Sequence, residues 1–136
     1  MKARFRLLQG RSVLIVDDSP QVVSLLEDVL GACGAVTHTA AGAVEAWRLL
    51  EAGHFDLLIA DMHVRGPRGG MLEQLRSRRA DLLRRTLLLS GRRWDAAERR
   101  RAESLGASVC PKPFDIDDLR RRACDLLAGR SISSVA

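Results

Sequence analysis

Short apolar runs that end in polar side chains form the dominant pattern of this sequence. Residues 13–16, 57–60, 86–89 and 107–110 are such runs. Runs of this length, bounded by turn residues, are typical of strands buried on both faces. A fifth segment, residues 35–40, alternates like a half-exposed strand and is predicted to lie at a sheet edge. The pattern therefore predicts five strands.

Apolar residues at helical spacing separate these strands. Between residues 20 and 33 they recur every three or four positions, and Ser19 and Pro20 suit the cap and first turn of a helix. Further helices are predicted at residues 43–52, 71–75, 95–105 and 115–128. Strands that alternate with helices five times predict an α/β fold, a doubly wound five-stranded parallel sheet of flavodoxin-like (βα)5 type. Right-handed crossovers favour the strand order 2-1-3-4-5.

The length of 136 residues indicates one domain with a real core. We expect a basic N-terminal arm at residues 1–10, the α/β domain at 11–128 and a C-terminal tail at 129–136. No apolar run approaches the roughly 20 residues that span a bilayer, so no membrane contact is expected. The three cysteines show no metal-type spacing, which favours a reducing, cytoplasmic location and a role as small buried hydrophobes.

Positive charge is concentrated in the second half of the chain. Residues 1–60 carry a net charge of −2 and residues 61–136 a net charge of +7, which gives the overall +5. The excess lies in arginine clusters at 76–79, 84–85, 92–93, 99–101 and 120–122. A basic face attracts nucleic acid or an acidic protein. Interleaved acidic residues equally suit an ordinary solvated surface.

Five polar residues come directly after the predicted buried strands. Asp17 and Asp18 follow the first, Asp61 the third, Ser90 the fourth and Lys112 the fifth. In an open α/β sheet these carboxyl ends share one edge, and the order 2-1-3-4-5 places the first and third strands side by side. The three carboxylates are therefore expected to converge.

Three converging carboxylates repel one another unless a proton or a cation joins them. Mg²⁺ suits oxygen ligands and leaves positions for water and phosphate oxygens, which suggests phosphoryl chemistry. We expect Asp61 to be the nucleophile, with Asp18 and Asp61 holding the metal and Asp17 close by. Lys112 would neutralise one phosphate oxygen and Ser90 would donate a hydrogen bond to another.

These residues resemble a known family. Asp17-Asp18, Asp61, Ser90-Gly91 and Lys112-Pro113-Phe114 look like the landmarks of the response-regulator receiver domain of two-component signalling, over residues 11–128. The resemblance implies a bacterial phosphoprotein that accepts a phosphoryl group on Asp61 from a histidine kinase or a histidine phosphotransfer protein. It also implies magnesium dependence, slow self-catalysed hydrolysis and a cis peptide before Pro113. Such a protein assists only its own phosphorylation and dephosphorylation and is not otherwise an enzyme.

Three further positions bear on how such a domain would work: one departs from the family pattern, and two lie where the family varies to tune its reaction rates. Val109 stands where the family usually has an aromatic switch residue that works together with the Ser90 position. The backbone carbonyl of His63 would be a third protein ligand of magnesium. His63 and Arg92 occupy the positions that tune phosphorylation and dephosphorylation rates in the family. How a switch would work with Val109 is left open by the sequence.

Three other readings compete. Residues 61–66 fit the Asp-x-His-x-x-Gly motif of cobalamin-binding domains, but the later signatures are absent and Asp17-Asp18 would go unexplained. Dinucleotide binding fails because no glycine cradle follows the first strand. A third reading, a phosphorylation-independent pseudo-receiver, is favoured by Val109 and by the remodelled loop 62–70. The chemical competence of all five site residues favours the phosphorylatable receiver.

The expected mode of action is protein contact. The sequence shows no output domain, so we expect a stand-alone receiver whose phosphorylation shifts an existing equilibrium. The surface of the fourth helix, fifth strand and fifth helix carries the clusters 99–101 and 120–122, which favours an acidic protein partner. DNA binding is disfavoured because no helix-turn-helix follows, and a weak homodimer is compatible with the pattern.

Overall fold

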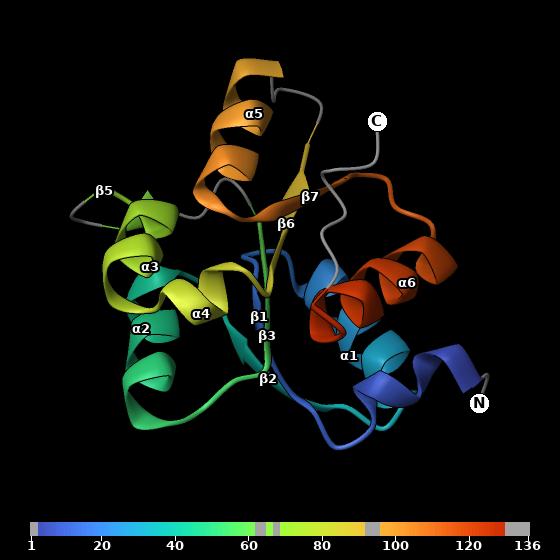
Figure 1. The fold of residues 1–136 in the computed structure, drawn as a ribbon. Coiled ribbons are helices and arrows are strands. Elements are labelled where there is room, and N and C mark those ends of the chain that lie inside the picture. The colour runs from blue at the N-terminus through green and yellow to red at the C-terminus, as the bar shows by residue number, and fades with distance from the viewer. Residues whose placement is uncertain (1–2, 62–64, 67–68, 92–95, 130–136) are drawn as a thin grey trace.

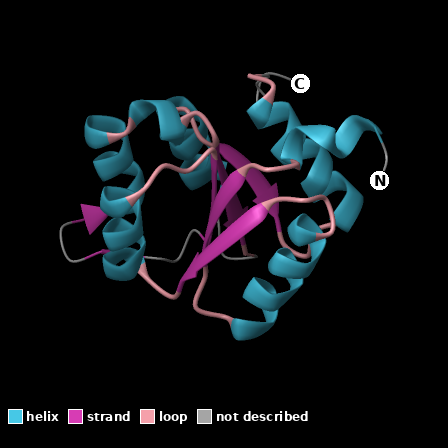
Figure 2. Cartoon of the chain, turned by 90° about the horizontal axis from the view of Figure 1, so that it is seen from below, coloured by secondary structure: helices cyan, strands magenta, loops and turns pink. Residues whose placement is uncertain are grey.

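A five-stranded parallel sheet lies at the centre of the molecule, with helices on both faces (Figures 1 and 2). The computed structural model describes residues 3–61, 65–66, 69–91 and 96–129. Its strands are β1 (Ser12–Val16), β2 (Val36–Ala40), β3 (Leu57–Asp61), β4 (Arg65–Gly66), β5 (Gly69–Gly70), β6 (Thr86–Ser90) and β7 (Ser108–Pro111). Its helices are the 3₁₀ helix η1 (Ala3–Leu8), α1 (Pro20–Gly31), α2 (Ala43–Ala52), α3 (Met71–Arg78), α4 (Ala80–Leu83), α5 (Ala96–Leu105) and α6 (Ile116–Leu127).

The strand order of the main sheet is β2-β1-β3-β6-β7, and all its pairs are parallel. Counted among the five main strands, this is the order 2-1-3-4-5, so the predicted fold class is confirmed. The short antiparallel pair β4–β5 and the one-turn helix α4 are additions that the sequence pattern did not predict. The predicted fourth and fifth helices correspond to α5 and α6.

Alternate side chains of each strand build two cores, one on each face of the sheet. Val13, Ile15 and Ile59 belong to the core shared with α1 and α6. Leu14 and Leu58 belong to the core shared with α2 to α5. Figure 1 shows these two groups of helices on opposite sides of the sheet. Burial on both faces explains why the strands are continuous apolar runs rather than alternating ones.

The helix cap that the sequence predicted at Ser19 is present, and a second cap lies at the start of α6. Ser19 Oγ accepts a hydrogen bond from the Val22 N–H at 3.4 Å, and Pro20 is the first residue of α1. Asp115 accepts from the Asp117 N–H at 2.7 Å at the start of α6. Because only Asp17 and Asp18 separate the end of β1 from the first cap, both acids are confined to the mouth of the sheet.

The segment expected as a basic arm folds in part against the domain. η1 packs on α6, and Phe5 and Leu8 are 2% and 0% exposed within the core that contains α1 and α6. The Arg120 guanidinium lies 5.6 Å from the centre of the Phe5 ring. Residues 5–8 thus contribute apolar surface to the core. The expected tail from residue 130 onward lies outside the described residues.

The cysteines Cys33, Cys110 and Cys124 are buried free thiols, as predicted. Burial raises the pKa of Cys110, and it raises the pKa of Cys124 to about 11. Such thiols stay protonated and unreactive at neutral pH. Over the described residues, no helix has both the length and the apolar character that a bilayer crossing requires.

Candidate functional site

Three carboxylates meet at the carboxyl ends of β1 and β3. The parallel register pairs Val16 with Ala60, which sets the following Asp17 and Asp61 level with each other. Asp17 and Asp61 are 2% and 8% exposed, while Asp18 is exposed. One oxygen from each of the three acids lies within 4.8 Å of the others. The predicted convergence of the acids is therefore present in the structure.

Lys112 reaches the same point from the end of β7. Its Nζ lies 3.3 Å from Asp17 Oδ2 and 3.4 Å from Asp61 Oδ2. Its backbone N–H donates to the Ser90 carbonyl at 2.7 Å, and the peptide between Lys112 and Pro113 is cis, as the family resemblance implies. The lysine side chain is 25% exposed. This placement bridges two buried carboxylates with one ammonium group.

Ser90 contributes a hydroxyl that has no partner. It ends β6, between the strands that carry Asp61 and Lys112, and it is 1% exposed. Its Oγ is buried and makes no hydrogen bond within the described part of the chain. An unpaired buried hydroxyl costs about 1–3 kcal/mol. Such a cost is expected where a ligand supplies the missing acceptor.

The acid cluster fits a magnesium ion. Three carboxylates and one ammonium carry a formal net charge of −2, which one divalent cation neutralises. Asp17 Oδ1 already accepts the Ser19 N–H at 2.9 Å, and Asp17 Oδ2 faces Lys112. Asp18 is exposed and forms no hydrogen bond with any described residue, so its oxygens are open to a ligand. An all-oxygen donor set of this kind is what Mg²⁺ prefers.

The remaining predicted site residues divide into two groups. His63 and Arg92 lie outside the described residues, so their roles stay predictions. Val109 is 7% exposed and packs in the core shared with α2 to α5. A valine there is a small buried apolar residue and provides no aromatic ring that could turn between two rotamers.

One contact near the site was missed by the sequence analysis. Arg122 of α6 donates from Nε to Asp118 Oδ2 at 2.8 Å and from Nη1 to the Val109 carbonyl at 2.8 Å. β7 is the edge strand of the sheet, so among the described residues no neighbouring strand lies on its outer side to donate a hydrogen bond. Arg122 supplies such a donor to the Val109 carbonyl. The signal was the i, i+4 spacing of Asp118 and Arg122, which was assigned to a basic surface cluster instead.

Replacing Arg122 by methionine is expected to lower the free energy of unfolding by about 1–3 kcal/mol, because it leaves the Val109 carbonyl without this donor. Urea unfolding measures the change. The matched control is Arg121→Met, since Arg121 pairs with Asp118 but is 52% exposed; its cost should stay below about 1 kcal/mol. Equal costs for the two variants would show that the Val109 contact adds nothing.

The ion pair between Arg122 and Asp118 is also expected to make the free energy of unfolding depend on pH. Burial acts to raise the pKa of Asp118, but hydrogen bonds and charges from Arg122 and Arg121 outweigh it, and the pKa lies below its ordinary value. A lowered folded-state pKa adds stability above the unfolded pKa, and this stability is lost as pH falls through the folded pKa. We expect a smaller acid-side loss in Arg122→Met than in the native chain.

Comparison with known proteins agrees with this geometry. The family model described as response regulator receiver domain matches residues 13–123. The DNA-binding transcriptional regulator NtrC of Rhizobium meliloti is 25% identical over 82% of this chain and 23% of its own length. The sensor histidine kinase RcsC of Escherichia coli is 29% identical over 80% of this chain and 11% of its own length. The chain thus spans less than a quarter of either curated relative.

Solved structures show the same fold. The receiver domain of a signal transduction histidine kinase from Syntrophus aciditrophicus has a TM-score of 0.75 and 26% identity, covering 93% of this chain and 97% of that one. Full-length FixJ from B. japonicum has a TM-score of 0.79 and 19% identity, covering 93% and 62%, and at that identity it supports the fold alone. The family match covers most of the chain and includes Asp17, Asp61, Ser90 and Lys112, and on this basis the chain belongs to the response regulator receiver domain family.

Proposed function

We propose that this chain is a receiver in a bacterial phosphorelay, which accepts a phosphoryl group on Asp61 from a histidine kinase or a histidine phosphotransfer protein. Receiver domains of two-component systems serve in general as phosphoacceptors that bind Mg²⁺ at an acidic pocket. The observation that carries the proposal is the cluster of Asp17, Asp18 and Asp61 bridged by Lys112. We further propose a cytoplasmic location.

The transfer step uses the side chains at the mouth of the sheet. A carboxylate oxygen of Asp61 attacks the phosphorus of the donor phosphohistidine. The new P–O bond forms as the P–N bond breaks, and the electron pair of that bond goes to the imidazole nitrogen. Lys112 neutralises charge on the transferring group, and the Ser90 hydroxyl donates to one of its oxygens.

A magnesium ion held by Asp18, Asp61 and the His63 carbonyl, with Asp17 close by, would supply further positive charge to the phosphoryl oxygens. Asp17 then has a positioning role, since the Ser19 N–H and Lys112 already hold its two oxygens. In the same proposal His63 and Arg92 set the rates of phosphorylation and hydrolysis. Ser90 and Val109 form the switch that reports the state of Asp61.

The output surface of this proposal comprises α5, β7 and α6. Arginines 120, 121 and 122 each pair with an aspartate of α6 itself, which neutralises much of the positive charge of that helix. Arg99 and Arg100 of α5 are exposed and form no ion pair with a described residue. Unpaired guanidinium groups favour an acidic protein partner that docks over α5. A weak homodimer through the same face is compatible with this charge pattern.

The decisive experiment is intact-mass measurement after incubation with acetyl phosphate, or with a phosphorylated histidine phosphotransfer protein. The native chain should gain the mass of one phosphoryl group only when Mg²⁺ is present. Asp61→Ala should gain none. The matched control Asp28→Ala, which removes an exposed carboxylate from α1, should behave as the native chain does.

Two outcomes would count against the proposal. An adduct that persists in Asp61→Ala would move the phosphoacceptor elsewhere. No adduct with either donor would favour the phosphorylation-independent module, for which the buried Val109 in place of an aromatic switch is the supporting observation. Calorimetric titration with Mg²⁺ would then separate a metal-binding site without acceptor activity from a site that has lost both.

A further inference from the structure

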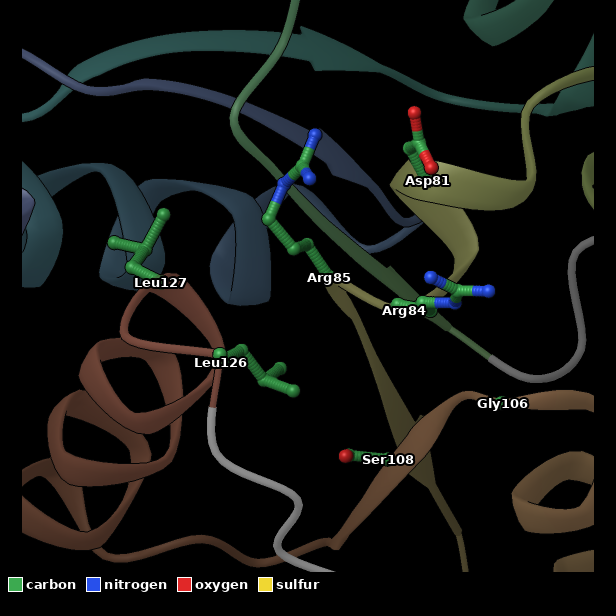
Figure 3. Close-up of a pocket in the computed structure, with 8 residues that line it drawn as sticks. Asp81, Arg84, Arg85, Gly106, Ser108, Leu126 and Leu127 are labelled. Atoms are coloured by element: carbon green, nitrogen blue, oxygen red, sulfur yellow. The ribbon is translucent and has the colours of Figure 1, made fainter.

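A second candidate site lies at the opposite end of the sheet from the acid cluster. A pocket of about 490 Å³ opens at the amino ends of β6 and β7 (Figure 3). It begins at Arg84 and Arg85, directly before β6, whereas Ser90 of the phosphorylation site ends the same strand. Five strand residues at about 3.3 Å each separate the two ends by roughly 16 Å. The pocket is therefore independent of the proposed phosphoacceptor site.

Two guanidinium groups give the pocket its positive charge. Arg85 Nε donates to the Asp56 carbonyl at 2.7 Å, which anchors that side chain on the turn before β3. Arg84 is exposed and pairs with no described residue, so its guanidinium is available to a ligand. Asp81 is the one acidic side chain among the described lining residues, and Figure 3 shows it directed away from Ser108. One carboxylate against two guanidinium groups leaves a net positive lining.

The inner wall combines an unpaired hydroxyl with leucine side chains. Ser108 is 4% exposed, and its hydroxyl makes no hydrogen bond with a described residue. Figure 3 shows this hydroxyl pointing toward Leu126 of α6. Leu127 lies on the same wall. A hydroxyl next to apolar side chains is a combination typical of small-molecule pockets.

Two glycines lie in the lining of the pocket. Gly106 and Gly129 line it with backbone alone, at φ values of +113° and +78°. This left-handed region favours glycine, so other residues would be strained there and would add a side chain at the rim. The volume falls within the usual range for small-molecule pockets, about 300–1,000 Å³.

We propose that this pocket binds a small organic anion, a molecule with one carboxylate or phosphate group on a short apolar body. The anionic group lies against the guanidinium of Arg84, because guanidinium groups bind both kinds of oxyanion through charge-assisted hydrogen bonds. The apolar body lies on Leu126 and Leu127. The Ser108 hydroxyl donates to the ligand and thereby gains the partner it lacks.

The test uses the full chain in magnesium-free buffer without a phosphodonor, so that its result does not depend on Asp61. Hexanoate and hexyl phosphate are titrated separately while amide NMR signals are followed. We expect saturable shifts at Gly106, Ser108 and Gly129 with a dissociation constant of about 1 mM, as suits a ligand of this size. The stronger of the two probes identifies the head group that the pocket prefers.

Two controls test the two halves of the ligand. Hexanol, which lacks the anion, and inorganic phosphate, which lacks the apolar body, should each bind at least about tenfold more weakly. Arg84→Gln should weaken hexanoate or hexyl phosphate binding about tenfold. Arg99→Gln removes the same charge from the exposed surface of α5 and should leave binding unchanged.

Three results would overturn the proposal. The first is that neither anion shifts the signals of the pocket, and the second is that hexanol binds as well as the anions. The third is that Arg84→Gln and Arg99→Gln weaken binding equally. The last result would indicate attraction to the overall positive charge of the chain instead of a site. Arg84 is exposed, so its variant is expected to fold, and the amide spectrum used for the titration verifies this.

Discussion

Replacing Lys112 by alanine is expected to slow phosphorylation of Asp61 about 100-fold, the usual effect of removing one charged group that stabilises a transition state. The ammonium lies 3.3 Å and 3.4 Å from oxygens of Asp17 and Asp61 and so brings a positive charge to both acids. The rate of adduct formation with acetyl phosphate and saturating Mg²⁺, followed by intact mass, measures the effect.

Magnesium binding separates a role in transfer from a role in building the site. Calorimetric titration of Lys112→Ala should show Mg²⁺ affinity equal to or higher than that of the native chain, because a competing cation has been removed from the carboxylates. The matched variant Lys112→Arg keeps the charge and should retain most of the rate. A phosphorylation rate in Lys112→Ala within about twofold of native would exclude Lys112 from the transfer step.

The sheet could be predicted because its strands are buried on both faces. Four apolar residues in a row, as in residues 57–60, have no solvent face, and only a parallel sheet covered by helices on both sides buries such a run. The site followed from the same logic. Once the first and third strands are neighbours, the residues after Val16 and Ala60 must lie at one edge, which brings Asp17 next to Asp61.

Contacts that depend on side-chain position could not be predicted in this way. The pattern gives the strand end on which Ser90 lies, but only the three-dimensional structure shows that its buried hydroxyl lacks a partner. Arg122 belongs to a run of three arginines on an amphipathic helix. Nothing in that run distinguishes the residue that reaches the Val109 carbonyl from its neighbours, because the choice depends on how α6 packs against β7.

Short elements were missed because their apolar signal is too brief. α4 has four residues, of which Leu82 and Leu83 are buried. In the sequence, two adjacent leucines do not distinguish such a short helix from a loop. Among residues 5–8 of η1, whose burial the structure describes, two apolar side chains are buried, Phe5 and Leu8, within a basic segment. Their spacing of three residues matches the period of a 3₁₀ helix. Two apolar residues that cover a single turn are too few to predict a helix from periodicity.

Replacing Leu8 by alanine is expected to lower the free energy of unfolding by about 3 kcal/mol, within the range of about 2–5 kcal/mol for a buried leucine. Leu8 is 0% exposed and packs in the same core as Leu30 of α1 and Leu126 of α6. Its loss would leave a cavity where η1 meets those helices. Urea unfolding of the native chain and the variant measures the change in midpoint at constant slope.

The neighbouring residue supplies a matched control. Leu7 has the same side chain on the same turn of η1 but is 38% exposed, so Leu7→Ala should cost less than about 1 kcal/mol. A difference between the two leucines requires η1 to be docked with the face seen in the structure. If both variants were neutral, residues 1–10 would behave as the free basic arm that the sequence pattern predicts. The core on the α1 and α6 side would then begin only at β1.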